Sequence, residues 1–139
     1  MGPFPGAKEF VKWVSTHFQL IILSDTFYEF AHPLMKQLDW PTIFCHKLET
    51  DEAGMISAYK LRQPDQKRQA VKALHGLNFR VIAAGDSYND TTMLGEADHG
   101  FLFDAPENVI AEFPQFPPIH GYDALKEAIR NASVRDIPA

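Results

Sequence analysis

The feature that most constrains the fold is a short apolar segment that ends in a glycine and two closely spaced acids. Residues 81–84 are Val, Ile, Ala and Ala, a run typical of a strand that is buried on both faces inside a parallel sheet. Gly85 ends this run, and Asp86 and Asp90 follow in a loop. Ligands bind just past the carboxyl ends of parallel strands, and two converging acids repel each other unless a cation or a Lys or Arg side chain lies between them. A hard cation such as Mg²⁺ would bind through one or two such carboxylates. The alternative is an ordinary turn, since Gly, Asp, Ser and Asn are common turn residues.

A second apolar run, residues 20–23, ends in a similar way at Ser24, Asp25 and Thr26. A helix is predicted to follow over residues 27–38. All three polar residues are common at helix N-caps, so capping of that helix is one interpretation. Hydroxyl groups and backbone N–H groups at a helix N-terminus also bind phosphate, and the other strand that ends in acids favours this second interpretation.

The rest of the chain predicts further helices and strands around these two segments. The predicted elements are helices over residues 8–17, 64–76 and 122–132, a helix that contains Met93 and Leu94, a helix that begins near residue 105, a hairpin of residues 42–48 and 56–61, and a strand over residues 99–103. Residues 113–118 are rich in proline and predict an extended connector. The alternation of strands and helices predicts one α/β domain over residues 1–139 with a mostly parallel sheet.

Composition and charge exclude several classes of protein. The 139 residues are 45% hydrophobic and carry a formal net charge of −5 with scattered basic residues, which argues against a nucleic-acid surface. No apolar run approaches the roughly 20 residues that span a bilayer, and the first residues lack the features of a signal peptide. Cys45 is the single cysteine, which fits a reducing compartment, so we expect a cytoplasmic protein. The six histidines show no metal-binding spacing and are expected to be structural or on the surface.

The loop after the first apolar segment also resembles a known family. The string Gly-Asp-Ser-Tyr-Asn-Asp at residues 85–90 resembles the fourth motif of the haloacid dehalogenase (HAD) superfamily, in which the acids hold the catalytic magnesium. Ser24 matches the second motif, a hydroxyl residue that closes an apolar strand, and Lys67 matches the lysine of the third. A lysine in the first turn of a helix faces the unfavourable end of the helix dipole, and a solvated surface lysine is the ordinary alternative. Arg68 and Lys60 are the alternatives for the role of Lys67.

The resemblance implies a three-layer α/β/α fold of the Rossmann type, a Mg²⁺ ion and a set of site residues. It implies that Asp86 binds the metal and that Asp90, the second acid of the metal site, orients bound water and Lys67. Lys67 and Ser24 would hold the phosphate. The other residues expected near the phosphate are Asp25, Thr26 and Asn89. The resemblance thus implies Lys67, Asp86 and Asp90 as the catalytic residues.

Several longer strings resemble one branch of the superfamily, that of phosphoserine phosphatases and phosphoserine:homoserine phosphotransferases. These strings are residues 22–30, 45–49, 83–94 and 105–110, and the resemblance extends from residue 5 to residue 122. It implies a small phosphorylated metabolite, similar to phosphoserine, as the substrate. Neither a nucleic acid nor a membrane is expected as a partner.

The chain lacks the first HAD motif, Asp-x-(Asp/Glu)-x-(Thr/Val), whose first Asp attacks the phosphate. Relatives of the branch carry this strand, followed by a small helical cap, before the point that corresponds to Met1. We therefore expect a HAD domain that is truncated at its N-terminus and inactive alone, with a separate chain as one source of the nucleophile. The alternative is a non-catalytic binding or assembly module with the HAD fold. A response-regulator receiver domain is excluded because its acidic pair and its phosphorylated aspartate have no counterpart here.

The missing strand also predicts how the chain assembles. In the HAD fold this strand lies between the strands at residues 20–23 and 81–84, so both would be left with unpaired backbone groups, which cost about 1–3 kcal/mol each when buried. We expect the two strands either to pair directly or to be covered by a second copy of the chain. A homodimer is favoured because it preserves the spacing between Ser24 and Asp86.

Overall fold

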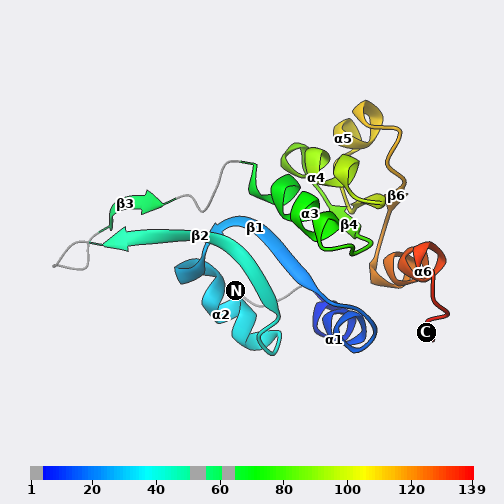
Figure 1. Cartoon of the computed structure of the whole chain (residues 1–139), viewed down its shortest axis with the longest axis horizontal. Coiled ribbons are helices and arrows are strands. Elements are labelled where there is room, and N and C mark those ends of the chain that lie inside the picture. Colours follow the sequence, from blue (N-terminus) through cyan, green and yellow to red (C-terminus); the bar gives the residue numbers. More distant parts are fainter. Residues whose placement is uncertain (1–4, 51–55, 61–64) are drawn as a thin grey trace. The chain divides into compact units, whose positions relative to one another are not determined.

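The computed structural model describes residues 5–50, 56–60 and 65–139 (Figure 1). The chain forms two compact units, Met1–Gln66 and Lys67–Ala139, and each unit has its own three-stranded sheet. In the described ranges no helix is long and apolar enough to cross a membrane. The single domain over residues 1–139 stays a prediction.

The first unit is a mixed sheet with two helices. Its elements in chain order are α1 (Ala7–His17), β1 (Ile21–Phe27), α2 (Tyr28–Gln37), β2 (Thr42–Thr50) and β3 (Ile56–Lys60). β2 is the central strand, and it pairs in parallel with β1 and antiparallel with β3. The antiparallel pair confirms the predicted hairpin, and the β1–α2–β2 crossover with parallel strands confirms the predicted α/β pattern.

Apolar side chains of α2 form the core of this unit. Ala31 and Met35 of α2 and Leu38, the residue just after it, recur at helical spacing and are buried. They pack against partly buried hydrophobic residues, which are Val11, Ile22, Leu34 and Ile43. Cys45, on β2, is only 1% exposed. Helix α2 continues through Pro33 without ending there.

β1 is longer than the sequence predicted. The polar residues 24–26 were expected to leave the strand and begin a helix, but β1 continues to Phe27 and α2 begins at Tyr28. The register with β2 is irregular between Leu23 and Phe27, so the three polar residues lie at a bulge inside the strand. Threonine and phenylalanine, the residue types at positions 26 and 27, are common in strands, which fits this extended backbone. The helix predicted over residues 27–38 is thus confirmed as Tyr28–Gln37, whereas the predicted end of the strand before Ser24 is wrong.

The second unit is a parallel sheet with helices between its strands. Its elements are α3 (Gln66–Gly76, which begins at the last residue of the first unit), β4 (Ile82–Gly85), a 3₁₀ turn η1 (Tyr88–Asp90), α4 (Thr91–Glu96), β5 (His99–Phe103), α5 (Glu107–Glu112), β6 (Pro118–Ile119) and α6 (Tyr122–Ala132). β5 is central and pairs in parallel with β4 and β6. The most deeply buried apolar residues of the second unit are Val71, Leu94, Leu102, Val109 and Leu125. The predicted strand over residues 99–103 and the helix over residues 122–132 are confirmed.

β1 and β4 were expected to lie in the middle of a sheet, but each is an edge strand of its own three-stranded sheet. Ala83 is buried but Ala84 is exposed, so the prediction that β4 is buried on both faces is wrong. This alternation is typical of a strand with one covered face. Among the described residues β1 pairs only with β2 and β4 only with β5, so each has one edge with no strand beside it. A homodimer that covers these edges stays a prediction.

Candidate active site

The loop after β4 folds back so that Asp90 lies against the end of the strand. A Cβ atom on Gly85 would lie only 2.5 Å from the Cβ of Asp90 and 2.6 Å from its Oδ2 atom. Real Cβ contacts are longer than this, so only glycine fits at the end of β4 while Asp90 keeps its place. The glycine that the sequence predicted as the end of a strand is in fact needed for the close approach of an acid.

Asp90 is held by four hydrogen bonds. Its Oδ2 atom accepts the backbone N–H of Asp86 at 2.9 Å and the backbone N–H of Ser87 at 3.2 Å. The Ser87 hydroxyl donates to the same oxygen at 3.3 Å. The Lys67 ammonium donates to the other oxygen, Oδ1, at 2.6 Å. Both carboxylate oxygens are therefore hydrogen-bonded, and the donors from Asp86, Ser87 and Lys67 hold the side chain of Asp90 in place.

Lys67 and Asp90 form a largely buried ion pair. Their side chains are 13% and 7% exposed, respectively. Burial raises the pKa of Asp90, but the hydrogen bond and the charge of Lys67 lower it, and the backbone N–H groups of Asp86 and Ser87 lower it further. The net result is a pKa below the ordinary value of 3.8, so Asp90 is ionised at neutral pH. The pair also explains how α3 tolerates a lysine in its first turn, because the charge of Lys67 is neutralised there.

Asp86 and Asn89 lie on the same loop but face solvent. Both residues are exposed. Among the described residues the Asp86 carboxylate has no hydrogen bond or ion pair. Asp86 is therefore the carboxylate at this loop that is available to a ligand, whereas the carboxylate of Asp90 is already bound within the protein.

These residues fit a magnesium ion in part. Within the described ranges no three His, Cys, Asp or Glu side chains gather closely enough to hold a metal ion. Mg²⁺ commonly binds proteins through one or two carboxylates and keeps several waters, and Asp86 can supply one such ligand. Three hydrogen bonds already go to Asp90 Oδ2, and the Lys67 ammonium occupies Oδ1. The geometry fits Asp90 better as the residue that orients Lys67 than as a direct metal ligand.

The other predicted phosphate residues lie in the first unit. Ser24 is half-buried in β1, and the side-chain amide of Gln66 donates a hydrogen bond to its carbonyl oxygen. Gln66 itself is only 2% exposed. Asp25 and Thr26 follow Ser24 in β1. The structure thus brings Lys67 and Asp90 together with the loop of Asp86 and Asn89 in the second unit, and the roles of these residues stay predictions. The residues placed in the first unit are Ser24, Asp25 and Thr26.

Sequence reasoning missed the contacts that attach the acidic loop to α5. The Tyr88 hydroxyl donates a hydrogen bond to Glu112 Oε2 at 2.6 Å, and the Asn108 amide donates to the Tyr88 hydroxyl at 3.4 Å. The rings of Tyr88 and Phe113 pack edge to face with centroids 5.8 Å apart. The hydrogen bond to the Glu112 carboxylate and its negative charge raise the pKa of Tyr88. No local pattern could predict this contact, because Tyr88 and Glu112 are 24 residues apart in the chain.

Comparison with protein families identifies a matching family for this chain. A family model described as haloacid dehalogenase-like hydrolase matches residues 2–98, well over half of the chain. The chain belongs to this family. The match includes Lys67 and the whole loop from Asp86 to Asp90.

Two curated relatives from Pseudomonas are similar over nearly all of this chain. It is 60% identical over 135 residues to a phosphoserine phosphatase of Pseudomonas syringae pv. tomato. The aligned residues cover 97% of this chain and 57% of the relative. It is also 60% identical over 135 residues to the phosphoserine phosphatase ThrH of Pseudomonas aeruginosa, with 97% of this chain and 66% of the relative covered. The chain therefore spans less than two thirds of the length of these relatives, and it is a phosphoserine phosphatase-like HAD domain.

Solved structures show the same fold at low sequence identity. A phospho-aspartyl intermediate analogue of phosphoserine phosphatase matches with a TM-score of 0.71 and 17% identity, over 93% of this chain and 64% of that one. A phosphoserine phosphohydrolase-like protein from Francisella tularensis matches with a TM-score of 0.71 and 22% identity, over 90% of this chain and 62% of that one. At such identities the similarity concerns the fold alone, and it confirms the predicted HAD-like α/β fold.

Proposed function

We propose that this chain supplies the phosphate-binding and metal-binding part of a phosphoserine phosphatase that acts on small phosphomonoesters with Mg²⁺. The observation that carries the proposal is the buried Lys67–Asp90 pair at 2.6 Å beside the exposed carboxylate of Asp86. A lysine fixed by an acid can present a positive charge to a phosphate without moving, and a pre-positioned charge stabilises a phosphoryl group best. The names of the two Pseudomonas relatives support phosphoserine as the substrate.

Each residue has a separate task in this proposal. Asp86 binds Mg²⁺, which when present neutralises charge on the phosphate oxygens. Lys67 contacts the phosphate, and the hydrogen bond to Asp90 holds Lys67 in position. Ser24 donates its hydroxyl to the phosphate. The residues that complete the phosphate site are Asp25, Thr26 and Asn89.

The proposal also requires a nucleophile from outside this sequence. No Asp-x-(Asp/Glu)-x-(Thr/Val) string occurs in the 139 residues, so the chain alone has no aspartate of the expected kind to attack phosphorus. We propose that a separate polypeptide with this motif completes the enzyme in the cytoplasm, and that a homodimer of this chain covers the strand edges and preserves the spacing of the site. The resemblance to phosphoserine:homoserine phosphotransferases makes homoserine the acceptor that we expect besides water.

The first test measures binding by the chain alone. Calorimetry with Mg²⁺ present should detect phosphoserine binding, and serine, which lacks the phosphate, should give no signal at the same concentration. Lys67→Met should weaken phosphoserine binding at least about tenfold, since it removes a charge-assisted hydrogen bond. Lys72→Met is the matched control, because Lys72 is an exposed lysine on the same helix.

The second test measures catalysis. Phosphate release from phosphoserine by the chain alone should stay far below ordinary enzymatic rates of about 1–10³ s⁻¹. Turnover at such a rate, abolished by Asp86→Asn, would show that a nucleophile in this chain was overlooked. Failure of phosphoserine to bind, with the fold intact, would refute the phosphate site and favour the alternative function, a non-catalytic binding or assembly module.

A further inference from the structure

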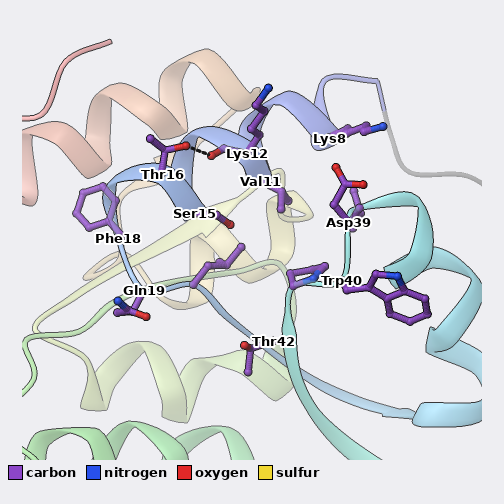
Figure 2. A pocket seen from close by; sticks show the side chains of 13 residues that line it. Lys8, Val11, Lys12, Ser15, Thr16, Phe18, Gln19, Asp39, Trp40 and Thr42 are labelled. Atoms are coloured by element: carbon purple, nitrogen blue, oxygen red, sulfur yellow. Dashed lines mark hydrogen bonds between the residues drawn. The ribbon is translucent and has the colours of Figure 1, made fainter.

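A pocket in the first unit lies at the N-terminal end of β1, whereas Ser24 lies in the middle of that strand. It has a volume of about 430 Å³ and is enclosed by α1, the residues that lead into β1 and the segment between α2 and β2 (Figure 2). Leu20 and Thr42, next to the starts of β1 and β2, line it. A strand rises about 3.3 Å per residue, so the four residues from Leu20 to Ser24 separate the pocket from the proposed phosphate residue by about 13 Å. Figure 2 shows side chains from all three segments around the pocket.

One wall of the pocket carries two lysines. Lys8 and Lys12 are four residues apart on α1, and both are exposed. Among the described residues neither ammonium group has an ion pair or a hydrogen bond. Like charges at this spacing repel each other, and Lys8 also faces the positive end of the helix dipole. A bound anion would offset both the repulsion between the lysines and the unfavourable interaction of Lys8 with the helix dipole.

The facing wall carries a carboxylate on an unusual backbone. Asp39 and Trp40 follow α2 and have φ angles of 62° and 59°, the left-handed region that non-glycine residues rarely occupy. Such a conformation is unfavourable for a residue when nothing compensates it. It is fixed by the hydrogen bond from the Trp40 N–H to the Met35 carbonyl oxygen at 2.8 Å. In the described ranges the Asp39 carboxylate has no ion pair, although it lines the same pocket as Lys8 and Lys12.

Between the charged walls the pocket is partly apolar. Val11, Leu20 and Leu38 contribute aliphatic surface, and Leu38 is only 8% exposed. The Trp40 indole is 55% exposed and packs edge to face on His32, with ring centroids 4.8 Å apart. A large aromatic ring that is half exposed at a pocket suits contact with a ligand.

We propose that this pocket binds a free α-amino acid with an aliphatic side chain. Its carboxylate lies between Lys8 and Lys12, its ammonium group pairs with Asp39, and its side chain contacts the aliphatic surface beside Trp40. A simple anion would satisfy the lysines but leave Asp39 facing a like charge, and a simple amine would do the reverse. The site is separate from the proposed phosphate site and does not depend on the proposed function.

The ligand test uses fluorescence of Trp40. The chain has two tryptophans, and Trp13 does not line the pocket, so Trp13→Phe leaves Trp40 as the single reporter. Leucine should change the emission with a Kd of about 1 mM. Isovalerate, which lacks the ammonium group, and isopentylamine, which lacks the carboxylate, should each bind at least about tenfold more weakly. Calorimetry on the unsubstituted chain repeats the comparison without any substitution.

Variants then assign the two charges. Asp39→Asn should weaken leucine at least about tenfold and leave isovalerate unchanged or tighter. Lys8→Gln combined with Lys12→Gln should weaken leucine and isovalerate alike and leave isopentylamine unchanged, while Lys72→Gln in the second unit should change nothing. Circular dichroism confirms that each variant is folded. Equal binding of leucine and isovalerate, or no leucine signal at about 20 mM in both methods, would overturn the proposal.

Discussion

The ion pair between Lys67 and Asp90 makes a specific prediction about stability and its dependence on pH. The substitution Lys67→Met keeps an unbranched side chain of similar length but removes the charge next to a carboxylate that is 7% exposed. Breaking a buried pair from one side costs about 3–5 kcal/mol, because the remaining charge stays buried without its partner. Asp90 keeps three hydrogen bonds, from Asp86 N–H, Ser87 N–H and the Ser87 hydroxyl. We therefore expect a loss at the lower end of that range, about 3 kcal/mol at pH 7.

The sign of the pH dependence follows from the lowered pKa of Asp90. A carboxyl group with a lower pKa in the folded state stabilises the fold above its unfolded pKa, near 3.8, and loses this contribution as the pH falls through the folded pKa. Removing Lys67 raises the folded pKa of Asp90, so the free energy of unfolding of the variant falls less as the pH is lowered. The difference in free energy of unfolding between Lys67→Met and the unchanged chain should thus be largest near pH 7 and should shrink below about pH 4.

Urea unfolding followed by circular dichroism at several pH values measures this difference. Lys72→Met, on the exposed side of the same helix, should change the free energy of unfolding by no more than about 0.5 kcal/mol at any pH. An equal loss for Lys67→Met at pH 7 and below pH 4 would show that packing, rather than the charge pair, stabilises this part of the fold. A loss no larger than that of the control would show that the pair contributes nothing.

Three further predictions follow from the same unit. Gly85→Ala places a Cβ 2.5 Å from the Asp90 Cβ and should destabilise by about 1–3 kcal/mol in thermal unfolding, whereas Gly76→Ala, with nothing within 4 Å, should be neutral or stabilising by up to about 1 kcal/mol; equal effects would contradict the close approach. Tyr88→Phe keeps the ring but removes the 2.6 Å hydrogen bond to Glu112, so amide hydrogen exchange should accelerate in the acidic loop and leave α6 unchanged; unchanged loop exchange would count against this attachment. Mg²⁺ should bind the chain alone only in the millimolar range by calorimetry, since a single exposed carboxylate is a poor site; micromolar affinity would mean that another acid of the chain completes it.

The parts of the fold that could be predicted from sequence are those in which a repeated local pattern decides the structure. The helix at residues 122–132 and the strand at residues 99–103 have the predicted bounds because apolar spacing and flanking glycine or proline agree there. β1 was predicted less well, since residues 24–26 favour a helix cap locally while pairing with β2 extends the strand. The left-handed Asp39 and Trp40 gave no signal, because neither is glycine.

In the candidate site too, local sequence patterns could be predicted, but contacts between distant residues could not. The loop from Gly85 to Asp90 stood out as a binding segment from its composition alone, but the partner of Asp90 could not be derived from spacing. Lys67 lies 23 residues away and was identified through resemblance to the family. In the structure Lys67 does lie next to Asp90, with its ammonium 2.6 Å from the carboxylate. Glu112 could not have been identified as the partner of Tyr88, since nothing in its surroundings distinguishes it from any exposed acid on a short helix.

The burial of Cys45 has a practical consequence for experiments on this protein. It is the single cysteine, it lies on β2 in the first unit, and it is 1% exposed. A thiol reagent can react with it only when that unit opens, so the labelling rate reports the open fraction of the first unit alone. An opening free energy of about 5 kcal/mol would slow labelling by roughly 10³–10⁴-fold relative to the unfolded chain. Lys67→Met should accelerate labelling only when the two units unfold together, so one thiol measures their thermodynamic coupling.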